Sequence, residues 1–253
     1  MNVEGKIAVV TGGASGIGRA TCLLLAERGA KIVVADVSID EARETAVAIE
    51  KLGGEAIVHN VDVTQPKQVQ ALFAAAEENF GGVDIVINNA GIVVGPPGWP
   101  DVPAEKSLAV INTNLGGVIV VLRTALDSFS RRGGGVIVNT SSQAALAPLA
   151  HDPAYGAAKA GIVYLTRACR DLAESQNVRV VATLPGMTDT PMHAKTGDGK
   201  PAQWLEEVLS QMESQPASDV AKTTLDLIED DSLVGVCRAC RSKALGGDFD
   251  IPD

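Results

Sequence analysis

The sequence predicts a single α/β domain: a doubly wound parallel sheet with helices on both faces, in three α/β/α layers. Apolar runs of strand length alternate with amphipathic segments of helix length along the chain. The composition is 46% hydrophobic but only 3% aromatic, which favours the Val- and Ile-rich core of a buried parallel sheet. The length of 253 residues suits one large α/β domain better than two small ones.

Each predicted strand is a short apolar run bounded by glycine or polar residues. In chain order the predicted strands are 6–12, 31–36, 55–63, 83–91, 134–142, 178–186 and 233–239. Each predicted helix carries apolar residues at helical spacing, and the helices are 16–29, 38–52, 64–80, 107–129, 152–175 and 217–230. Strand–helix–strand alternation makes right-handed crossovers, which place the strands in one parallel sheet that the last strand closes.

Two segments are predicted to be irregular, mobile loops. Residues 93–103 contain four prolines and two glycines, and residues 187–204 are polar and contain glycine. The region from about residue 187 to residue 212 is expected to act as a substrate loop or lid on the domain, which spans residues 1–253.

Charge and hydropathy exclude some classes of function. The formal net charge of -10 repels phosphate backbones, so nucleic-acid binding is not expected. No apolar run approaches the ~20 residues of a membrane span, and the start, MNVEGKIAVV, lacks the pattern of a signal peptide. A cytoplasmic protein with reduced thiols is therefore expected, the thiols being Cys22, Cys169, Cys237 and Cys240.

Cys237 and Cys240 have the CxxC spacing of a metal or redox pair. They lie in an apolar run that is predicted to be a strand, and no second Cys or His pair completes four ligands. Buried or edge thiols are the favoured interpretation, and no metal site is predicted.

The turn after the first predicted strand, TGGASGIG at 11–18, is rich in glycine. Gly12, Gly16 and Gly18 let the backbone turn tightly and approach a pyrophosphate, which a helix N-terminus attracts. Ser15 and Ile17 lie in the same turn and are expected to contact the cofactor. A tight turn without a ligand is the alternative, but a position between a strand and a helix favours dinucleotide binding.

Asp36 ends the second predicted strand, eighteen residues after Gly18. A carboxylate at that point accepts hydrogen bonds from the ribose hydroxyls of NAD and repels the 2′-phosphate of NADP. NADP-binding proteins usually carry Arg or Lys where this chain has Ser15 and Val37. The predicted cofactor is therefore NAD.

Further motifs follow in a fixed order and resemble those of one family. They are, after the glycine-rich turn, VDV (61–63), NNAG (88–91), Asn114, SS (141–142), YGAAK (155–159) and PGMTDT (185–190). The chain resembles the short-chain dehydrogenase/reductase family, in its compact single-domain form, over nearly its whole length. The resemblance implies a Rossmann fold, an NAD(P)-linked oxidoreductase and a homo-oligomer, either a dimer or a tetramer.

The resemblance also implies which residues contact the cofactor. They are Asp62 and Val63 beside the adenine, Asn89, Ala90 and Gly91 at the end of the fourth strand, and Pro185, Gly186, Thr188 and Thr190 around the nicotinamide. Tyr155 and Lys159 belong to the same contact set, with Lys159 holding the nicotinamide ribose.

The implied catalytic set is Asn114, Ser142, Tyr155 and Lys159. Ser142 is chosen over Ser141 because it lies thirteen residues before Tyr155, as the family's serine usually does. Asn114 is expected to anchor a water that connects Lys159 to solvent, and Ser142 to donate a hydrogen bond to the substrate oxygen.

Elementary chemistry supports the Tyr–Lys pair independently of the resemblance. Tyr155 and Lys159 are i and i+4 and therefore neighbours on one helical face. A free phenol has a pKa of about 10, and a nearby ammonium and the positive nicotinamide ring are expected to lower that pKa. Tyr155 could then exchange a proton with an alcohol during hydride transfer. The alternative is a surface Tyr–Lys pair without function.

The substrate side of the site is expected to be mostly apolar. Its predicted residues are Val94, Trp99, His151, Met187 and Met192, with Val93, Leu146, Leu149, Trp204 and Met212 as further walls. No Arg or Lys occurs among them, which favours a neutral, hydrophobic secondary alcohol or its ketone. His151 could supply one polar contact or be a solvated loop residue. Tyr164, on the same predicted helix as Tyr155, is expected to pack.

The C-terminal end departs from the family pattern, because CRSKALGGDFDIPD lacks the Asp-Gly-Gly that many members carry. The tail resembles that of the 15-hydroxyprostaglandin dehydrogenase subgroup, which does not name a substrate. The oligomer interface and one wall of the pocket therefore stay open.

Two other functions fit parts of the pattern. A catalytically silent NAD-binding sensor or scaffold would use the same fold, but such proteins usually lose the Tyr or the Lys. An NAD-dependent epimerase or dehydratase usually needs a larger C-terminal sugar domain than 253 residues allow.

Overall fold

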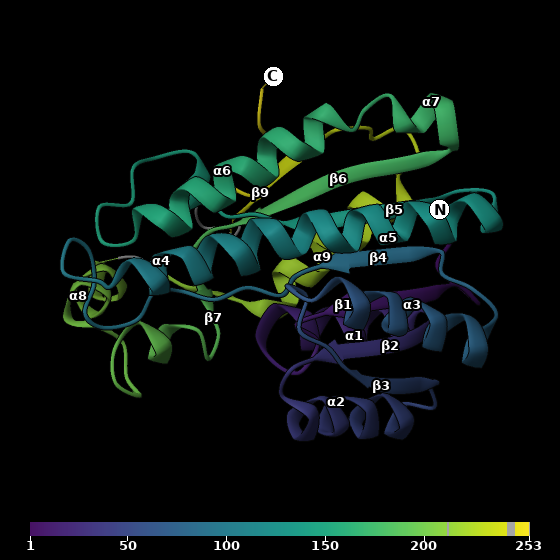
Figure 1. The fold of residues 1–253 in the computed structure, drawn as a ribbon, viewed down its shortest axis with the longest axis horizontal. Helices are drawn as coiled ribbons and strands as arrows, with labels where there is room; N and C mark the ends of the chain where they lie inside the picture. The colour runs from purple at the N-terminus through teal and green to yellow at the C-terminus, as the bar shows by residue number, and fades with distance from the viewer. Residues whose placement is uncertain (212, 242–245, 253) are drawn as a thin grey trace.

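The computed structural model, which describes residues 1–211, 213–241 and 246–252, has the expected doubly wound sheet. Its strand order is β3-β2-β1-β4-β5-β6-β9-β10 (Figure 1). The parallel strands are β1 (Ile7–Thr11), β2 (Lys31–Asp36), β3 (Ala56–Asn60), β4 (Ile85–Asn88), β5 (Gly135–Thr140), β6 (Val178–Pro185) and β9 (Cys237–Cys240). β1 lies between β2 and β4. The chain first forms β2 and β3 on one side of β1 and then returns to form β4, β5 and β6 on the other, which is the doubly wound topology.

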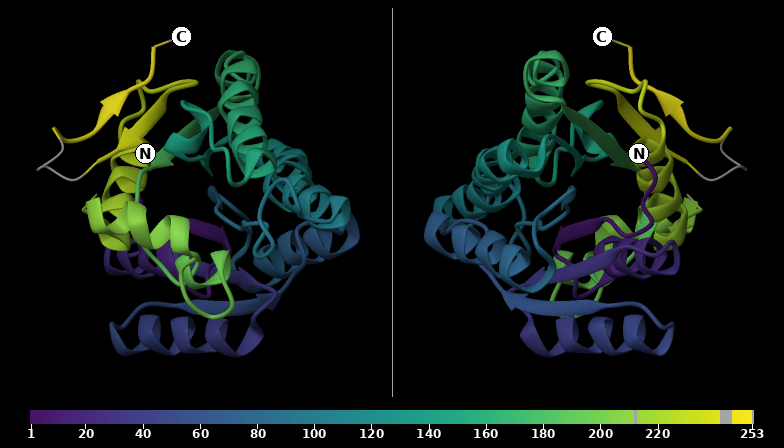
Figure 2. Two further views of the ribbon diagram at one scale, coloured as in Figure 1. Left: turned by 90° about the vertical axis from the view of Figure 1, so that its left-hand side faces the viewer. Right: turned by 90° about the vertical axis from the view of Figure 1, so that its right-hand side faces the viewer.

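Helices cover both faces of this sheet, as the two end-on views show (Figure 2). One face carries α1 (Gly16–Glu27), α2 (Ile39–Lys51) and α9 (Ala217–Glu229). The other carries α3 (Pro66–Phe80), α4 (Ala104–Ile111), α5 (Gly117–Arg132), α6 (Pro153–Ala168) and α7 (Leu172–Gln176). The fold is therefore a single three-layer α/β/α domain.

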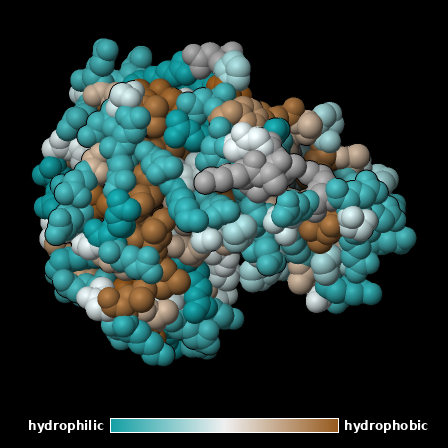
Figure 3. Space-filling model, turned by 180° about the vertical axis from the view of Figure 1, so that it is seen from behind, coloured by the Kyte–Doolittle hydropathy of each residue, from teal (hydrophilic) through white to brown (hydrophobic). Residues whose placement is uncertain are grey.

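The core lies in two apolar layers, one on each side of the sheet. Along β1, Ala8 and Val10 contact the layer under α1 and α9, while Val9 contacts the layer under α3 and α5. Successive side chains of a strand point to opposite faces, so a strand that is covered twice needs an unbroken apolar run. The outer surface is mostly hydrophilic where it is seen from behind, with apolar residues gathered in a band (Figure 3).

The predicted helix 107–129 is longer than expected and contains an irregular turn. α4 and α5 form one helix, Ala104–Arg132, joined by a π-helical turn over Asn112–Gly116. This helix is long and apolar enough to cross a membrane by length and composition alone, a test that the core helix of a soluble domain also passes. π turns are rare and often occur at functional sites, and this one contains Asn114.

Residues 187–212 are more regular than the predicted loop. They contain β7 (Thr188–Asp189), a 3-10 turn (His193–Thr196) and α8 (Gln203–Gln211), and β7 pairs with β8 (Gln215–Pro216). The predicted irregular loop, 187–204, covers only the first two residues of α8, whose amphipathic segment QWLEEVLSQ buries Leu205 and was not predicted as a helix. Met212 lies outside the described residues.

The sheet does not close on the predicted strand 233–239. Its observed counterpart, β9, begins at Cys237, and β10 (Phe249–Asp250) adds an antiparallel edge beyond it. Ion pairing holds β10: the guanidinium of Arg238 donates to both carboxylate oxygens of Asp250, at 2.6 and 3.1 Å. A two-residue strand lacks a periodic pattern, so the sequence did not indicate it.

The four cysteines, all within the described residues, form no disulfide, and Cys22, Cys237 and Cys240 are buried. Burial raises the pKa of Cys240 to about 12, so this thiol stays protonated. Within the described ranges, no group of three or more His, Cys, Asp or Glu residues could hold a metal ion. The CxxC pair is thus a pair of buried strand thiols.

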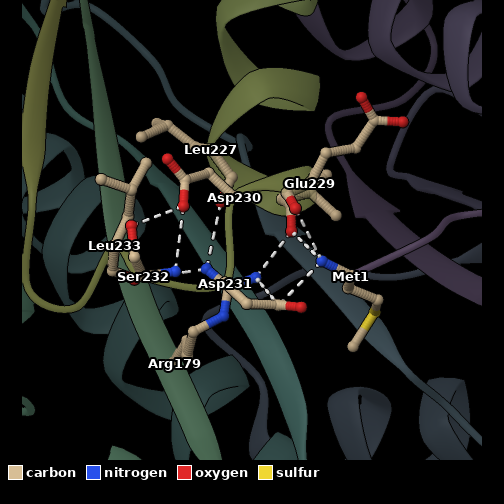
Figure 4. Close-up of polar contacts among 9 residues, drawn as sticks. Met1, Arg179, Leu227, Glu229, Asp230, Asp231, Ser232 and Leu233 are labelled. Atoms are coloured by element: carbon tan, nitrogen blue, oxygen red, sulfur yellow. Dashed lines mark hydrogen bonds and ion pairs between the residues drawn. The ribbon is translucent and has the colours of Figure 1, made fainter.

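The C-terminal end of α9 is capped by the side chain of Arg179, which lies on β6 (Figure 4). The guanidinium donates to the carbonyls of Leu227 and Leu233 at 3.1 and 3.2 Å and to that of Ile228 at 2.6 Å. It also pairs with the carboxylate of Asp231 at 3.1 Å. Cations are favourable at this end of a helix because its last carbonyls have no intrahelical donors.

A second cation supports the same helix end. The amino group of Met1 donates to the carbonyls of Ile228 and Glu229, at 2.9 and 3.0 Å, and to Asp231 at 2.7 Å. Met1 and the start of β6 thus meet at the end of α9.

Arg179→Met should destabilise the protein strongly. The change keeps the apolar stem but removes the guanidinium from the carbonyls of Leu227 and Leu233 and leaves that of Ile228 with the amino group of Met1 alone. We therefore expect a loss of about 3 kcal/mol in the free energy of unfolding. Urea titration followed by circular dichroism measures it. The control is Arg28→Met, since Arg28 forms an exposed ion pair with Glu229 at the same helix end and should cost under about 1 kcal/mol. Equal losses in both variants would contradict the capping role.

Candidate active site

The predicted site residues gather at the carboxyl ends of the parallel strands. Thr11 of β1, Asn88 of β4 and Asn139 of β5 occupy neighbouring positions in register. The order of the sheet reverses beside β1, and ligands of doubly wound sheets bind at such a reversal. The turns that follow β1, β4, β5 and β6 carry the glycine-rich segment, NNAG, Ser142 and PGMTDT.

The glycine-rich turn has no room for side chains. Gly12 and Gly16 have φ of +67° and +52°, which other residues rarely adopt. A Cβ on Gly18 would lie 2.0 Å from the carbonyl oxygen of Gly12, and a Cβ on Gly16 would lie 3.1 Å from Cγ2 of Thr190. The turn therefore lies against the segment after β6, which brings together two predicted contact regions that are far apart in the sequence.

The N-terminus of α1 can receive an anion. In the described chain no side chain caps this helix, and its first turn contains no acidic residue. Ser15 is the exposed N-cap residue and Ile17 lies in the first turn. Uncapped N–H groups and the helix dipole attract a phosphate, so the turn fits the pyrophosphate of a dinucleotide.

Asp36 lies at the end of β2 and faces the glycine-rich turn. Its carboxylate accepts hydrogen bonds from the N–H groups of Ala14 and Ser38, both at 3.0 Å. A carboxylate accepts about four hydrogen bonds, so acceptor capacity remains for ribose hydroxyls. The next side chain, Val37, is 64% exposed and carries no charge.

Asp62 and Val63, predicted to lie beside the adenine, follow β3. Asp62 accepts from the N–H and hydroxyl of Thr64 at 2.9 and 2.8 Å, and Val63 is buried. A cavity of about 520 Å³ opens beside Asp62, and its wall includes Thr64, Gln65, Ala109, Asn112, Thr113, Gly116 and Val120. Of these lining residues only Asp62 is a predicted cofactor contact, and most of the others lie along α4, the π-helical turn and α5.

The NNAG segment ties the end of β4 to the glycine-rich turn. The side-chain amide of Asn89 donates to the carbonyls of Thr11 and Gly12, at 3.2 and 3.1 Å. The N–H groups of Asn89 and Ala90 donate to the hydroxyl of Thr11. A Cβ on Gly91 would lie 3.3 Å from Oδ1 of Asn114, so Gly91 lets these segments approach.

Asn114 is fully buried, and its side chain is engaged within the protein. Its amide donates to the carbonyl of Ile92 at 2.9 Å, and its carbonyl oxygen accepts from the N–H of Ile92 at 2.8 Å. The side chain therefore holds the segment after β4 against the π-helical turn. The predicted water contact would fall to the backbone carbonyl of Asn114.

Tyr155 and Lys159 lie on one face of α6, as their spacing predicts. The ammonium nitrogen of Lys159 lies 5.5 Å from the centre of the Tyr155 ring and donates to the carbonyl of Thr140 at 2.7 Å. Lys159 is only 4% exposed, and burial lowers its pKa to about 8. Its positive charge is thus held next to the phenol at a cost in solvation.

In the protein itself burial raises the pKa of Tyr155, a hydrogen bond with Ser142 lowers it, and the charge of Asp152 raises it further. Loss of water around a phenolate is the largest of these causes. The lowering expected from the ammonium and the nicotinamide ring together stays a prediction for the protein with its cofactor bound. Tyr155 is therefore a neutral phenol, and hence a proton donor, at neutral pH.

The two serines after β5 have different surroundings. Ser141 is buried, and its hydroxyl donates to the carbonyl of Lys159 at 2.7 Å. Ser142 is half-buried and hydrogen bonded to Tyr155, and its hydroxyl accepts from the N–H of Ala144 at 3.1 Å. Ser142 is thus the one that can reach a substrate oxygen, in agreement with its choice from the sequence.

The segment predicted for the nicotinamide is held by one backbone carbonyl. The carbonyl of Cys240 accepts from the side-chain amides of Gln143 and Gln215, at 2.9 and 3.1 Å, and from the N–H of Gly186 at 3.3 Å. Thr188 is buried, and its hydroxyl donates to the carbonyl of Gly186 at 3.0 Å. The sequence could not indicate Cys240, because every residue has such a carbonyl.

Around these groups lie the other predicted members of the site. Pro185 ends β6, Met187 and Met192 are half-buried in the following segment, and Trp99 and Leu146 are 54% and 45% exposed. Tyr164 does not pack as predicted, because it is 77% exposed.

His151 connects two of the predicted substrate segments. Its ring stacks on that of Trp204 from α8, with centroids 4.8 Å apart and planes 10° apart. Its carbonyl accepts from the N–H of Trp99 at 3.3 Å. Residues 93–103 are therefore irregular but anchored, since Lys106 also donates to the carbonyl of Pro96 at 2.6 Å.

Asp152 is a site residue that the sequence analysis missed. It is the N-cap of α6, and its carboxylate accepts from the N–H of Tyr155 at 3.0 Å. The signal was present, because Asp followed by Pro153 is typical of a helix start.

Fold and site together define a class of protein: a doubly wound oxidoreductase domain that binds a nicotinamide dinucleotide. The family model described as short chain dehydrogenase matches residues 6–201. The chain therefore belongs to the short-chain dehydrogenase family, whose members bind NAD or NADP.

Two named relatives and one solved structure illustrate what this chain is similar to. Cis-4-hydroxycyclohexanecarboxylate dehydrogenase of Sinomonas cyclohexanicum is 40% identical over 189 residues, which are 75% of this chain and 76% of the relative. 15-Hydroxyprostaglandin dehydrogenase [NAD(+)] of Bos taurus is 34% identical over 249 residues, 93% of this chain and 90% of the relative. The crystal structure of levodione reductase has a TM-score of 0.85 at 29% identity, covering 92% of this chain and 95% of that one.

Lys159→Met should change stability in a pH-dependent way. The pKa of Lys159 is about 8 in the folded protein, against an ordinary value of 10.5. Between these values the unfolded chain binds a proton that the folded protein does not, so the wild type gains stability as pH rises. Relative to the variant, we expect a gain of about 3 kcal/mol across this window.

Urea unfolding of both proteins at several pH values between 7 and 10.5 measures the difference. An exposed control, Lys222→Met, should show a constant difference from the wild type. A constant difference for Lys159→Met as well would contradict the buried ammonium.

Proposed function

We propose that the protein is an NAD-dependent dehydrogenase that interconverts a secondary alcohol and its ketone, with Tyr155 as general acid and base. The observation that carries this proposal is the convergence of Ser142, Tyr155 and Lys159 next to Gly91, in the segment whose Asn89 is hydrogen bonded to the glycine-rich turn. The names of two relatives support it, since both describe dehydrogenases of hydroxylated compounds.

The roles of the residues follow from their chemistry. The nicotinamide, when bound, accepts a hydride from the carbinol carbon in oxidation and supplies it to the carbonyl carbon in reduction. Tyr155 takes the hydroxyl proton of the alcohol or returns it to the ketone oxygen. Ser142 donates a hydrogen bond to the same oxygen, and the positive charge of Lys159 favours the phenolate when the proton has moved.

The raised pKa of Tyr155 gives the two directions different pH dependences. Reduction needs the phenol, which predominates at neutral pH, and oxidation needs the phenolate. Oxidation should therefore accelerate as pH rises through the pKa, while reduction slows.

NAD is proposed as the cofactor because of Asp36. Its carboxylate lies at the turn that faces the ribose region, and neither Ser15 nor Val37 offers a cation for a 2′-phosphate. The name of the bovine relative, whose match covers 93% of this chain, includes NAD(+).

The proposed substrate is neutral and mainly hydrophobic around the reacting carbon. Val93, Val94, Leu149 and Met187 are half-buried apolar side chains, and the buried carboxylate of Asp152 disfavours a second negative charge nearby. The lysines of the 187–212 segment, Lys195 and Lys200, are exposed. We propose this segment, with α8, as the lid.

The two alternatives have less support. A silent NAD-binding sensor would not need the buried ammonium of Lys159, which costs solvation energy. An epimerase or dehydratase is not what the two relatives named above are, since both are dehydrogenases.

A homo-oligomer, dimer or tetramer, and a cytoplasmic location are also proposed. The apolar side chains of Leu108, Ile119 and Tyr164 are 59%, 47% and 77% exposed on α4, α5 and α6. Exposed apolar residues on adjacent helices are typical of an interface. Sedimentation at a monomer's mass would argue against it.

A homologous series of neutral secondary alcohols, assayed with NAD by the absorbance of NADH, tests the reaction. Because each buried methylene contributes ~0.8 kcal/mol, kcat/KM should rise about fourfold per methylene until the pocket is full. Tyr155→Phe should lose turnover by about 10³-fold and keep NAD binding. No turnover of any alcohol would favour the sensor, and a preference for small charged hydroxy acids would contradict the substrate class.

Cofactor choice has its own test. We expect NAD to be preferred over NADP by at least ~10-fold in kcat/KM, which corresponds to about 1.4 kcal/mol. Asp36→Ala combined with Val37→Arg should relax or reverse this preference, whereas Asp40→Ala, which removes an exposed carboxylate from α2, should not. Equal efficiency with both cofactors in the wild type would overturn the assignment of Asp36.

A further inference from the structure

The carboxylate of Asp152 connects two parts of the site that are far apart in the sequence. Asp152 is only 6% exposed. Its Oδ1 accepts from the N–H of Tyr155 at 3.0 Å, and its Oδ2 accepts from the N–H of Val94 at 2.9 Å. One oxygen thus caps the helix that carries Tyr155, and the other holds the start of segment 93–103.

We propose that Asp152 is a positioning residue, which fixes the substrate segment 93–103 against Tyr155 and keeps a negative charge beside its phenol. The inference rests on the proposed function, because it takes Tyr155 as the acid and base and residues 93–103 as a pocket wall. It adds a residue that acts through both of them without touching the reacting atoms.

Only a carboxylate of this length can make both contacts. Asn offers one acceptor oxygen, and its NH₂ group would face the N–H of either Val94 or Tyr155. Ser is a good N-cap, but its single short hydroxyl cannot also serve Val94. The other polar anchors of the segment are the carbonyl of His151, at 3.3 Å from the Trp99 nitrogen, and the exposed Lys106. Asp152 is therefore its buried charged anchor.

The charges around Tyr155 make Asp152 electrostatically distinct. On α6 itself, Asp152 lies before Tyr155 and Lys159 lies after it, the latter 5.5 Å from the ring centre. Of the elements packed against α6, α4 contributes Glu105 and Lys106, both exposed, and the turn Gln143–Ala145 has no charged side chain. The strands contribute charges that are already paired.

Those paired charges are Arg179 of β6 with Asp231 and Arg238 of β9 with Asp250. Among the charged groups just named, Asp152 is hence the negative charge that acts on Tyr155, and it raises the pKa of Tyr155. Removing that charge lowers the pKa, so oxidation, which needs the phenolate, should begin at lower pH.

Asp152→Ser separates the two contacts, because serine can keep the helix cap but cannot accept the hydrogen bond from the N–H of Val94. With the best alcohol of the series and NAD, we expect KM to rise about tenfold, as for loss of one hydrogen bond to a charged group, with kcat changed less than about threefold. The rise of kcat/KM with pH should move to lower pH. Hydrogen exchange of the peptide 92–95 should accelerate, a readout that needs no substrate.

Asp219→Ser is the matched control, since it makes the same change in the first turn of α9 and should alter none of these quantities. Asp152→Asn is the second variant should the serine variant fail to fold, with the same expectations. If either variant keeps the KM, the pH profile and the hydrogen exchange of the wild type, the inference is overturned, while the proposed function stays intact. Full activity of Tyr155→Phe would instead overturn the proposed function, and only the exchange result would then bear on Asp152.

Discussion

Hydrogen bonds between buried amide side chains fix α6 against the sheet, and the other groups of the site depend on that position. The side chain of Asn88 donates to that of Asn139 at 2.9 Å, and Asn139 donates to the hydroxyl of Thr166 on α6 at 3.0 Å. Buried amides are costly when unpaired, so these hydrogen bonds fix α6 relative to β4 and β5. The bond of Lys159 to the carbonyl of Thr140 holds the same helix about two turns nearer its N-terminus.

Rigid support of α6 allows an unfavourable charge to be kept in the site. Burial lowers the pKa of Lys159 and raises that of Tyr155. In both groups burial therefore disfavours the charged form. Functional sites commonly hold groups with such displaced pKa values. In this protein the two shifts act on neighbours one helical turn apart, and a proton can pass at the phenol without any movement of α6.

Segments around α6 are tied to it by a few specific contacts. The carboxylate of Asp152 holds residues 93–103, the ring of His151 stacks on α8, and the carbonyl of Cys240 holds the segment after β6. Each tie joins parts of the chain that are distant in sequence. The C-terminal region thereby supports the site, although it departs from the family pattern that the sequence analysis used.

The sequence alone determined that the core is a parallel sheet, that a glycine-rich turn follows its first strand and that Asp36 ends its second. It also determined that Tyr155 and Lys159 share one face of a helix. These features depend on local periodicity and on backbone freedom. It missed β10, which is short, and α8, which begins in the predicted polar loop, and it misjudged the exposure of Tyr164. Only the tertiary structure decided these, since burial and charge around a group come from segments that the local sequence does not contain. The two bonds of Asp152 are the clearest case: a helix start predicts the first, but the second depends on how residues 93–103 fold back.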